Sequence, residues 1–120
     1  MKARLLLIVD DDESLREALC ELLSYRFRTV GARHGQAALD YLVTAEKPAL
    51  ILLDLMMPVM DGWQFRSIQQ KDPRFSNIPV IVMSASRSLE ARPIDALRLL
   101  KPFDLEQLLE LIDSVLGPAP

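Results

Sequence analysis

The side chains with the clearest chemical potential are polar residues that stand directly after apolar runs. Five of them do so: Asp10, Asp11, Asp54, Ser84 and Lys101. Carboxylates held together repel, and at about 4 Å each pair costs roughly 1 kcal/mol in water and several times more when partly buried. A hard divalent cation such as Mg²⁺ relieves this repulsion, because it prefers oxygen ligands. With a lysine and a hydroxyl opposite, such acids would form a pocket for a phosphoryl group whose acceptor is a carboxylate.

Taken singly, each of these residues has an ordinary structural explanation. Acids that precede a helix, as Asp10–Asp12 do, are commonly caps, and Asp54 alone could be a solvated loop aspartate. Ser84 and Lys101 alone would be solvated loop residues. The joint arrangement favours a phosphoryl pocket, because every one of these residues ends a predicted strand.

The elements that must position these residues are apolar runs of strand length alternating with segments of helical periodicity. The expected strands cover residues 3–9, 27–32, 50–53, 79–83 and 96–100. The expected helices cover residues 13–26, 36–45 and 63–71, with a last helix that begins after Asp104. Asp12, Asp61 and Asp104 are the expected N-caps of the first, third and last of these helices. Parallel strands need helical crossovers, so the predicted fold class is α/β, a three-layer sandwich around a five-stranded parallel sheet. The carboxyl ends of parallel strands share one edge, where ligands bind.

The connection between the fourth and fifth strands is unusually short. Residues 85–94 are near the minimum of about 10–12 for a crossover with its helix, and Pro93 shortens any helix further. We expect a shortened fourth helix of at most about two turns around residues 88–92.

Composition narrows the class of protein. The 120 residues predict a single domain, 1–120, with 117–120 as a loose tail. A net charge of −3 without a basic run argues against direct nucleic-acid binding. The first apolar run is too short for a membrane span or a signal sequence, and the single Cys20 indicates a reducing compartment. The expected location is the cytoplasm, away from the membrane.

Four motifs in order, LLIVDDDESLR, LILLDLMMPVMDG, PVIVMSA and LLKPF, make the sequence resemble the receiver domain of bacterial two-component response regulators. The resemblance covers essentially the whole chain. It implies the flavodoxin-like strand order 2-1-3-4-5. It also implies that the chain is not an enzyme in the usual sense, since it would catalyse only its own phosphotransfer and slow aspartyl-phosphate hydrolysis.

Residue by residue, the resemblance implies that Asp54 is the phospho-acceptor. It implies that Asp10 and Asp11 bind Mg²⁺ together with Asp54 and the backbone carbonyl of Met56. Ser84 and Lys101 match the hydroxyl and the lysine that turn toward the phosphoryl group. Both side chains can reach the phosphoryl group only by moving. Their movement would shift the protein surface between two conformations, one for each phosphorylation state.

The implied partners are a sensor histidine kinase or a phosphotransfer protein as phosphodonor, and a downstream protein that reads the phosphorylated state. No output domain follows residue 120 in this sequence, so we expect the output to pass through that second protein. The sequence leaves homodimerisation open.

The sequence departs from the family on the output side, in the shortened fourth crossover and at one switch position. Arg98 stands where the family commonly has a switching Tyr or Phe, and burying an unpaired guanidinium is expensive. We therefore expect the face formed by residues 85–98 to signal differently from typical receivers. Met56 and Ser86 occupy positions that tune self-dephosphorylation in the family. Neither side chain positions a water well, so a long-lived phosphoryl group is expected.

Two other functions compete with this interpretation. A small phosphatase of the haloacid dehalogenase type would use a D-x-D motif, which Asp10 and Asp12 could supply, but it leaves Asp54 unexplained. A phosphorylation-independent interaction module with a receiver-like fold is favoured by the altered fourth crossover and disfavoured by the complete set of pocket residues.

Overall fold

A computed structural model of the chain describes residues 3–85 and 92–117. Five parallel strands form one sheet in the order β2-β1-β3-β4-β5. The strands are β1 (Leu5–Val9), β2 (Arg28–Ala32), β3 (Leu50–Asp54), β4 (Val80–Ala85) and β5 (Leu97–Lys101). The helices are α1 (Glu13–Leu23), α2 (Gly35–Thr44), α3 (Gly62–Lys71) and α5 (Leu105–Leu116). The predicted α/β sandwich and its strand order are confirmed.

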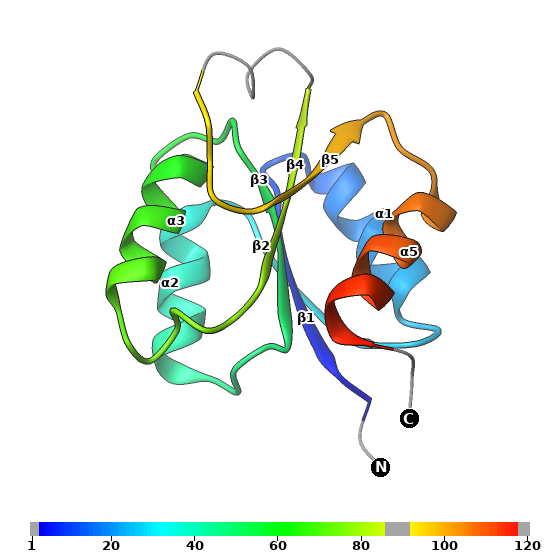
Figure 1. Cartoon of the computed structure of the whole chain (residues 1–120), viewed down its shortest axis with the longest axis horizontal. Coiled ribbons are helices and arrows are strands. Elements are labelled where there is room, and N and C mark those ends of the chain that lie inside the picture. The colour runs from blue at the N-terminus through cyan, green and yellow to red at the C-terminus, as the bar shows by residue number, and fades with distance from the viewer. Residues whose placement is uncertain (1–2, 86–91, 118–120) are drawn as a thin grey trace.

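The sheet lies between two helical layers, with α1 and α5 on one face and α2 and α3 on the other (Figure 1). Side chains of a strand alternate between faces, so each central strand feeds both layers. In β1, Leu6 and Ile8 pack toward α1 and α5, whereas Leu7 and Val9 pack toward α2 and α3. Because both faces are covered, every residue of β1 and β3 is buried.

Aspartates begin three of the helices. The side chains of Asp12, Asp61 and Asp104 accept hydrogen bonds from the first turns of α1, α3 and α5. At α3 and α5, Gln64 and Gln107 complete capping boxes. These caps agree with the sequence-based expectations.

Several helix and strand boundaries differ from the predicted ones. Helix α1 ends at Leu23 and not at residue 26, because the Ser24 amide closes the helix on the Cys20 and Glu21 carbonyls. Helix α2 begins at Gly35, where Nδ1 of His34 accepts a hydrogen bond from the Ala37 amide and acts as the cap. The periodicity of apolar residues gave no sign of a histidine cap. Strand β5 extends one residue further than expected and so includes Lys101.

The connection into β5 takes no helical form over residues 92–96. Ile94 and Ala96 pack against the apolar cluster on the α2 and α3 side of the sheet. The helix expected around residues 88–92 lies outside the described residues except for Arg92. None of the helices in the described part of the chain is both long and apolar enough to cross a membrane.

Candidate functional site

The carboxyl ends of β1, β3 and β5 bring a lysine between two buried aspartates. Asp10 directly follows β1 and is fully buried, and Asp54 ends β3 with 6% of its surface exposed. Lys101 ends β5, and its long side chain reaches past β4. Its Nζ donates to Asp10 Oδ2 at 3.1 Å and to Asp54 Oδ1 at 3.3 Å. The three residues therefore form one charged network at this edge of the sheet.

Asp10 is held by several contacts besides Lys101. Its second carboxylate oxygen, Oδ1, accepts from the Asp12 amide at 2.9 Å. Its backbone amide donates to the Ala32 carbonyl at 3.1 Å, and its carbonyl accepts from Arg16 Nη1 at 2.8 Å. Arg16 was absent from the sequence-based site, because its position on α1 gave no sign that it reaches back to β1.

Three acids lie close enough together to share a cation. One carboxylate oxygen from each of Asp10, Asp11 and Asp54 lies within 4.8 Å of the other two. Asp11 is exposed while its two neighbours are buried, so the cluster opens to solvent on one side. A set of hard oxygen donors with room for water fits Mg²⁺, which keeps several waters when bound to proteins.

The charges in this cluster are strongly coupled. Burial, together with the nearby Asp10 carboxylate, raises the pKa of Asp54 from 3.8 to about 6, although the Lys101 ammonium acts in the opposite direction. Burial disfavours the charge on Lys101, but hydrogen bonding to Asp10 and the attraction of Asp54 outweigh it and raise the lysine pKa. Without a cation, the cluster therefore holds more negative charge than one lysine balances.

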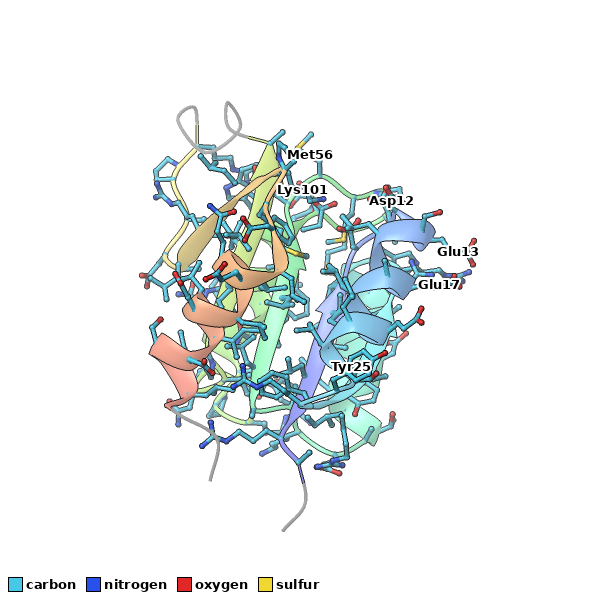
Figure 2. The ribbon with its side chains drawn as sticks, turned by 90° about the vertical axis from the view of Figure 1, so that its right-hand side faces the viewer. Asp12, Glu13, Glu17, Tyr25, Met56 and Lys101 are labelled. Carbon is cyan, nitrogen blue, oxygen red and sulfur yellow. The ribbon has the colours of Figure 1, made fainter. Side chains whose placement is uncertain are left out.

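The side chains of the remaining predicted site residues that the structure describes make no hydrogen bond to this network. Ser84 is buried near the end of β4, and its Oγ donates to the neighbouring Ala85 carbonyl at 2.8 Å. The Met56 side chain is 63% exposed at the same edge of the molecule as Lys101 (Figure 2). Arg98 is exposed on β5, and Ser86 lies outside the described residues. Ser84 would have to turn before it could contact a group on Asp54.

A glycine behind Asp54 was also missed as part of the site. At Gly62, the first residue of α3, an added Cβ would lie 2.7 Å from the Asp54 carbonyl oxygen and 2.8 Å from Leu55 Cα. The Gly62 amide donates to the Leu55 carbonyl at 2.8 Å. The sequence predicted an N-cap at Asp61 but not that α3 packs directly against the backbone of the Asp54 segment.

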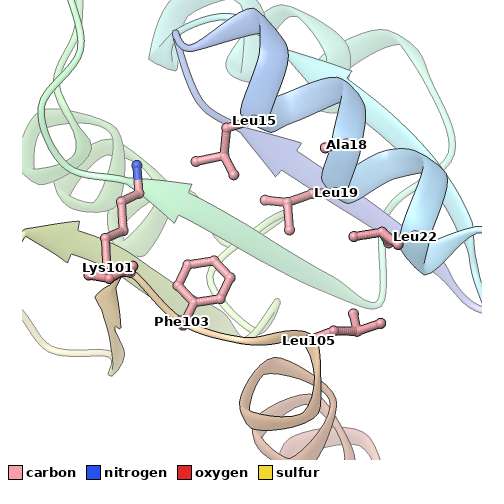
Figure 3. A pocket seen from close by; sticks show the side chains of 8 residues that line it. Leu15, Ala18, Leu19, Leu22, Lys101, Phe103 and Leu105 are labelled. Carbon is pink, nitrogen blue, oxygen red and sulfur yellow. The ribbon is translucent and has the colours of Figure 1, made fainter.

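An apolar groove of about 440 Å³ begins beside the lysine (Figure 3). One side is formed by α1 and the other by the chain from the end of β5 into α5. Its lining residues are Leu15, Ala18, Leu19, Leu22, Lys101, Pro102, Phe103 and Leu105. A surface that is mostly apolar and continuous with a charged site is a candidate for protein contact.

The positions of Asp12 and Asp54 do not support a phosphatase of the haloacid dehalogenase type. Asp12, the second acid of the D-x-D motif, directs its side chain to the Leu15 amide and caps α1. Asp54, which that interpretation leaves without a role, lies in the charged network instead.

Comparison with known proteins finds response regulators among the relatives of this chain. Response regulator Rre1 of Synechocystis sp. is 34% identical over 120 residues, which cover 93% of this chain and 51% of the relative. Response regulator MprA of Mycolicibacterium vanbaalenii is 36% identical over 117 residues, which cover 92% and 49%. The chain thus spans about half the length of these curated relatives.

Solved structures agree over almost their full length. The response regulator receiver protein from Pseudomonas putida superposes with a TM-score of 0.83 at 30% identity, covering 95% of this chain and 98% of that one. The chemotaxis response regulator CheY4 of Vibrio cholerae superposes with a TM-score of 0.84 at 27% identity, covering 96% and 99%. The sequence model of the response regulator receiver domain family matches residues 6–113, and the chain belongs to that family.

Proposed function

We propose that this chain accepts a phosphoryl group on Asp54 and works as the phosphorylated switch of a two-component phosphorelay. The observation that carries the proposal is the lysine between two buried carboxylates, Asp10 and Asp54, at the carboxyl edge of a receiver fold. Asp54 is held rigidly by the strand beneath it and keeps 6% of its surface exposed at the edge where ligands bind in such sheets. We place this reaction in the cytoplasm, with a sensor histidine kinase or a phosphotransfer protein as donor.

In the proposed step, a carboxylate oxygen of Asp54 attacks the phosphorus of a phosphohistidine. A new O–P bond forms and the P–N bond breaks. The electron pair of the P–N bond stays on the donor nitrogen, and the imidazole becomes neutral with a proton that its other nitrogen already carried or that comes from water. Lys101 already contacts Asp54 and can follow the new charge, because an ammonium stabilises phosphoryl oxygens. Ser84 would give up its bond to the Ala85 carbonyl and donate to a phosphoryl oxygen.

The acidic cluster would hold Mg²⁺ through Asp10, Asp11 and Asp54, with the Met56 carbonyl as a further ligand. When bound, the cation would neutralise the negative charge that otherwise opposes the approach of a phosphoryl group. The chain's own contribution is to fix the buried carboxylates, which Lys101 and the Asp12 amide do for Asp10.

The apolar groove is where we propose that the phosphodonor docks. Any donor must bring its phosphohistidine to Asp54, so the surface of the donor must contact the residues around Lys101. The groove begins at Lys101 and continues along α1. Leu22, 45% exposed on its lining, would then be covered by the donor.

We expect intact-mass analysis to show one phosphoryl adduct after incubation with acetyl phosphate and Mg²⁺, and none in Asp54→Asn. Omission of Mg²⁺ should slow the labelling strongly, and Mg²⁺ titration followed by thermal stability gives a binding readout independent of phosphorylation. Absence of an adduct in a folded, Mg²⁺-binding protein would contradict the proposal.

The Met56 side chain cannot hold a water molecule in place for attack on the phosphoryl group. We therefore expect the phosphoryl group on Asp54 to be long-lived. The mass measurement repeated over time checks this, and hydrolysis within seconds would contradict it.

A further inference from the structure

The 92–96 segment, which leads into β5, is fastened to α3 by side chains of that helix. The indole Nε1 of Trp63 donates to the Arg92 carbonyl at 3.2 Å, and the Arg92 guanidinium lies 4.6 Å from the centroid of the Trp63 ring. Arg66 donates through Nε and Nη2 to the Asp95 carbonyl at 3.0 and 2.8 Å. Gln70 Nε2 donates to Asp95 Oδ2 at 3.3 Å. Figure 1 shows this segment on the α3 side of the sheet.

Arg66 also connects the 92–96 segment to the loop that precedes β4. Its Nη1 donates at 2.8 Å to Oε1 of Gln69, a fully buried side chain. The Gln69 amide nitrogen donates in turn to the carbonyls of Phe75 and Ile78, both at 2.9 Å. Side chains of α3 therefore hold both the loop that precedes β4 and the segment that follows it along the chain. The hydrogen bonds to Asp95 in this network are exposed.

Helix α3 is at the same time seated on the acceptor segment. Gly62 packs so closely against the Asp54 carbonyl and Leu55 that no Cβ fits between them. The helix is thus tied at its N-terminus to the backbone of Asp54 and along its outer face to the connection into β5.

We propose that phosphorylation of Asp54 releases the 92–96 segment from α3, and that this segment with the exposed edge of α3 reports the state of the site. The inference rests on the proposed function. Ser84 on β4 has to leave the Ala85 carbonyl to reach a phosphoryl group, and Lys101 on β5, which already contacts Asp54, follows the new charge. The strands that flank the connection are therefore displaced. Helix α3 stays on the Asp54 backbone, and the displacement falls on the contacts between the two.

Those contacts are suited to break. The bonds from Trp63, Arg66 and Gln70 to the segment are exposed, and water can replace each of them. The apolar contacts of the segment come from Ile94 and Ala96, which are only partly buried. Regions held by exposed hydrogen bonds and few apolar contacts open at low free energy. Arg98 is exposed on β5, at the position where the family commonly has a Tyr or Phe that switches between buried and exposed states. Because Arg98 does not take that role, the release of the 92–96 segment supplies the change of surface instead.

The test uses the wild-type chain with beryllium fluoride and Mg²⁺ as a stable mimic of the phosphoryl group. Within 92–96 the Ala96 amide donates to the Ile94 carbonyl at 3.0 Å, and we expect its hydrogen exchange to accelerate at least about tenfold, which corresponds to about 1.4 kcal/mol of local opening free energy. The emission of Trp63, the only tryptophan of the chain, should shift to the red as its ring loses the cover of Arg92. Asp54→Asn should show neither change.

Matched variants separate the role of α3 from general loosening. Arg66→Lys keeps the charge but loses the forked contact with Asp95, so exchange over 92–96 should already be fast without beryllium fluoride. Gln70→Ala removes one exposed bond and should give a smaller acceleration in the same segment. Ser67→Ala, on the exposed face of the same helix, should match the wild type.

The outcomes distinguish this inference from the proposed function. Phosphorylation by acetyl phosphate without any change in exchange or Trp63 emission would overturn the release of the segment and leave the acceptor role intact. Failure of both phosphorylation and beryllium fluoride binding would overturn the acceptor role and the inference with it. Slower exchange over 92–96 on activation would also overturn the inference, because it would mean tighter docking on α3.

Discussion

At the scale of single residues, the fold holds three carboxylates close to one lysine, so negative charge exceeds positive charge in the site. Asp10 and Asp54 are buried beside one lysine, and Asp11 adds a third carboxylate at the rim. The Asp54 pKa of about 6 is the measure of this imbalance, because burial and the charge on Asp10 both oppose ionisation. An acid with a raised pKa in the folded state binds protons more tightly there than in the unfolded chain. Stability therefore falls as the pH rises from 3.8 to about 6, and it stays lowered above that range.

We expect Asp54→Asn to be more stable than the wild type at about pH 7 without Mg²⁺, because the substitution removes a carboxylate that is costly to ionise. The gain should be up to about 3 kcal/mol by linkage, and it should shrink as the pH falls toward about 4, where Asp54 becomes neutral. Urea unfolding across this pH range measures it. Added Mg²⁺ should narrow the gap by stabilising the wild type, and a gap that widens toward acid pH would contradict the expectation.

At the scale of elements, each site residue depends on how a strand ends and how the next helix begins. The Asp12 cap starts α1 right after Asp10, so the chain turns away and leaves the Asp10 carboxylate in the site. On the other side, the Asp61 capping box starts α3 at Gly62, which lets the helix approach the Asp54 backbone closely. Helix starts therefore determine the position of the carboxylates as much as the strands do.

Gly62→Ala should destabilise the protein by roughly 1–3 kcal/mol and slow the phosphorylation of Asp54, because its Cβ would meet backbone atoms that cannot yield without moving the acceptor. Chemical denaturation and the rate of adduct formation with acetyl phosphate measure the two effects. Gly31→Ala is the matched control for stability alone. Its Cβ would meet only the Arg16 side chain, at 3.1 Å, which can adjust, but Arg16 also contacts the Asp10 carbonyl. Equal stability of the two variants would show that the close approach at Gly62 has little energetic weight.

At the scale of the whole molecule, the site and two different surfaces meet at one edge. The apolar groove leads away along α1 and α5, and the 92–96 segment lies across the sheet on the α3 side. Under the proposed function, reception and output would therefore use opposite faces of the same sheet. The chain spans about half the length of its curated relatives.

Leu22→Glu should weaken phosphotransfer from a phosphohistidine protein at least about tenfold in kcat/KM, since a charge in the groove must be desolvated when the donor docks. Labelling by acetyl phosphate should be unchanged, because a small donor needs no docking surface. Val43→Glu, at an exposed apolar residue of α2 on the opposite face, is the control and should transfer like the wild type. Equal loss in both variants would place the docking surface elsewhere.

The sequence by itself determined the layers and the location of the site. Continuous apolar runs read as strands buried on both faces, and polar residues at their ends predicted an edge rich in carboxylates. This works because burial on both faces leaves a local trace in each strand. The caps Asp12, Asp61 and Asp104 were readable for the same reason, since a cap and its partners are neighbours in sequence.

Only the tertiary structure decided which side chains touch. The network of Lys101 with Asp10 and Asp54, the contact from Arg16 to the Asp10 carbonyl, and the seat of Gly62 behind Asp54 all join separate elements. The helix expected around residues 88–92 lies outside the described residues apart from Arg92, and the docking of residues 92–96 on α3 had no local sign. Such contacts depend on the distance between elements after packing, which no window of the sequence contains.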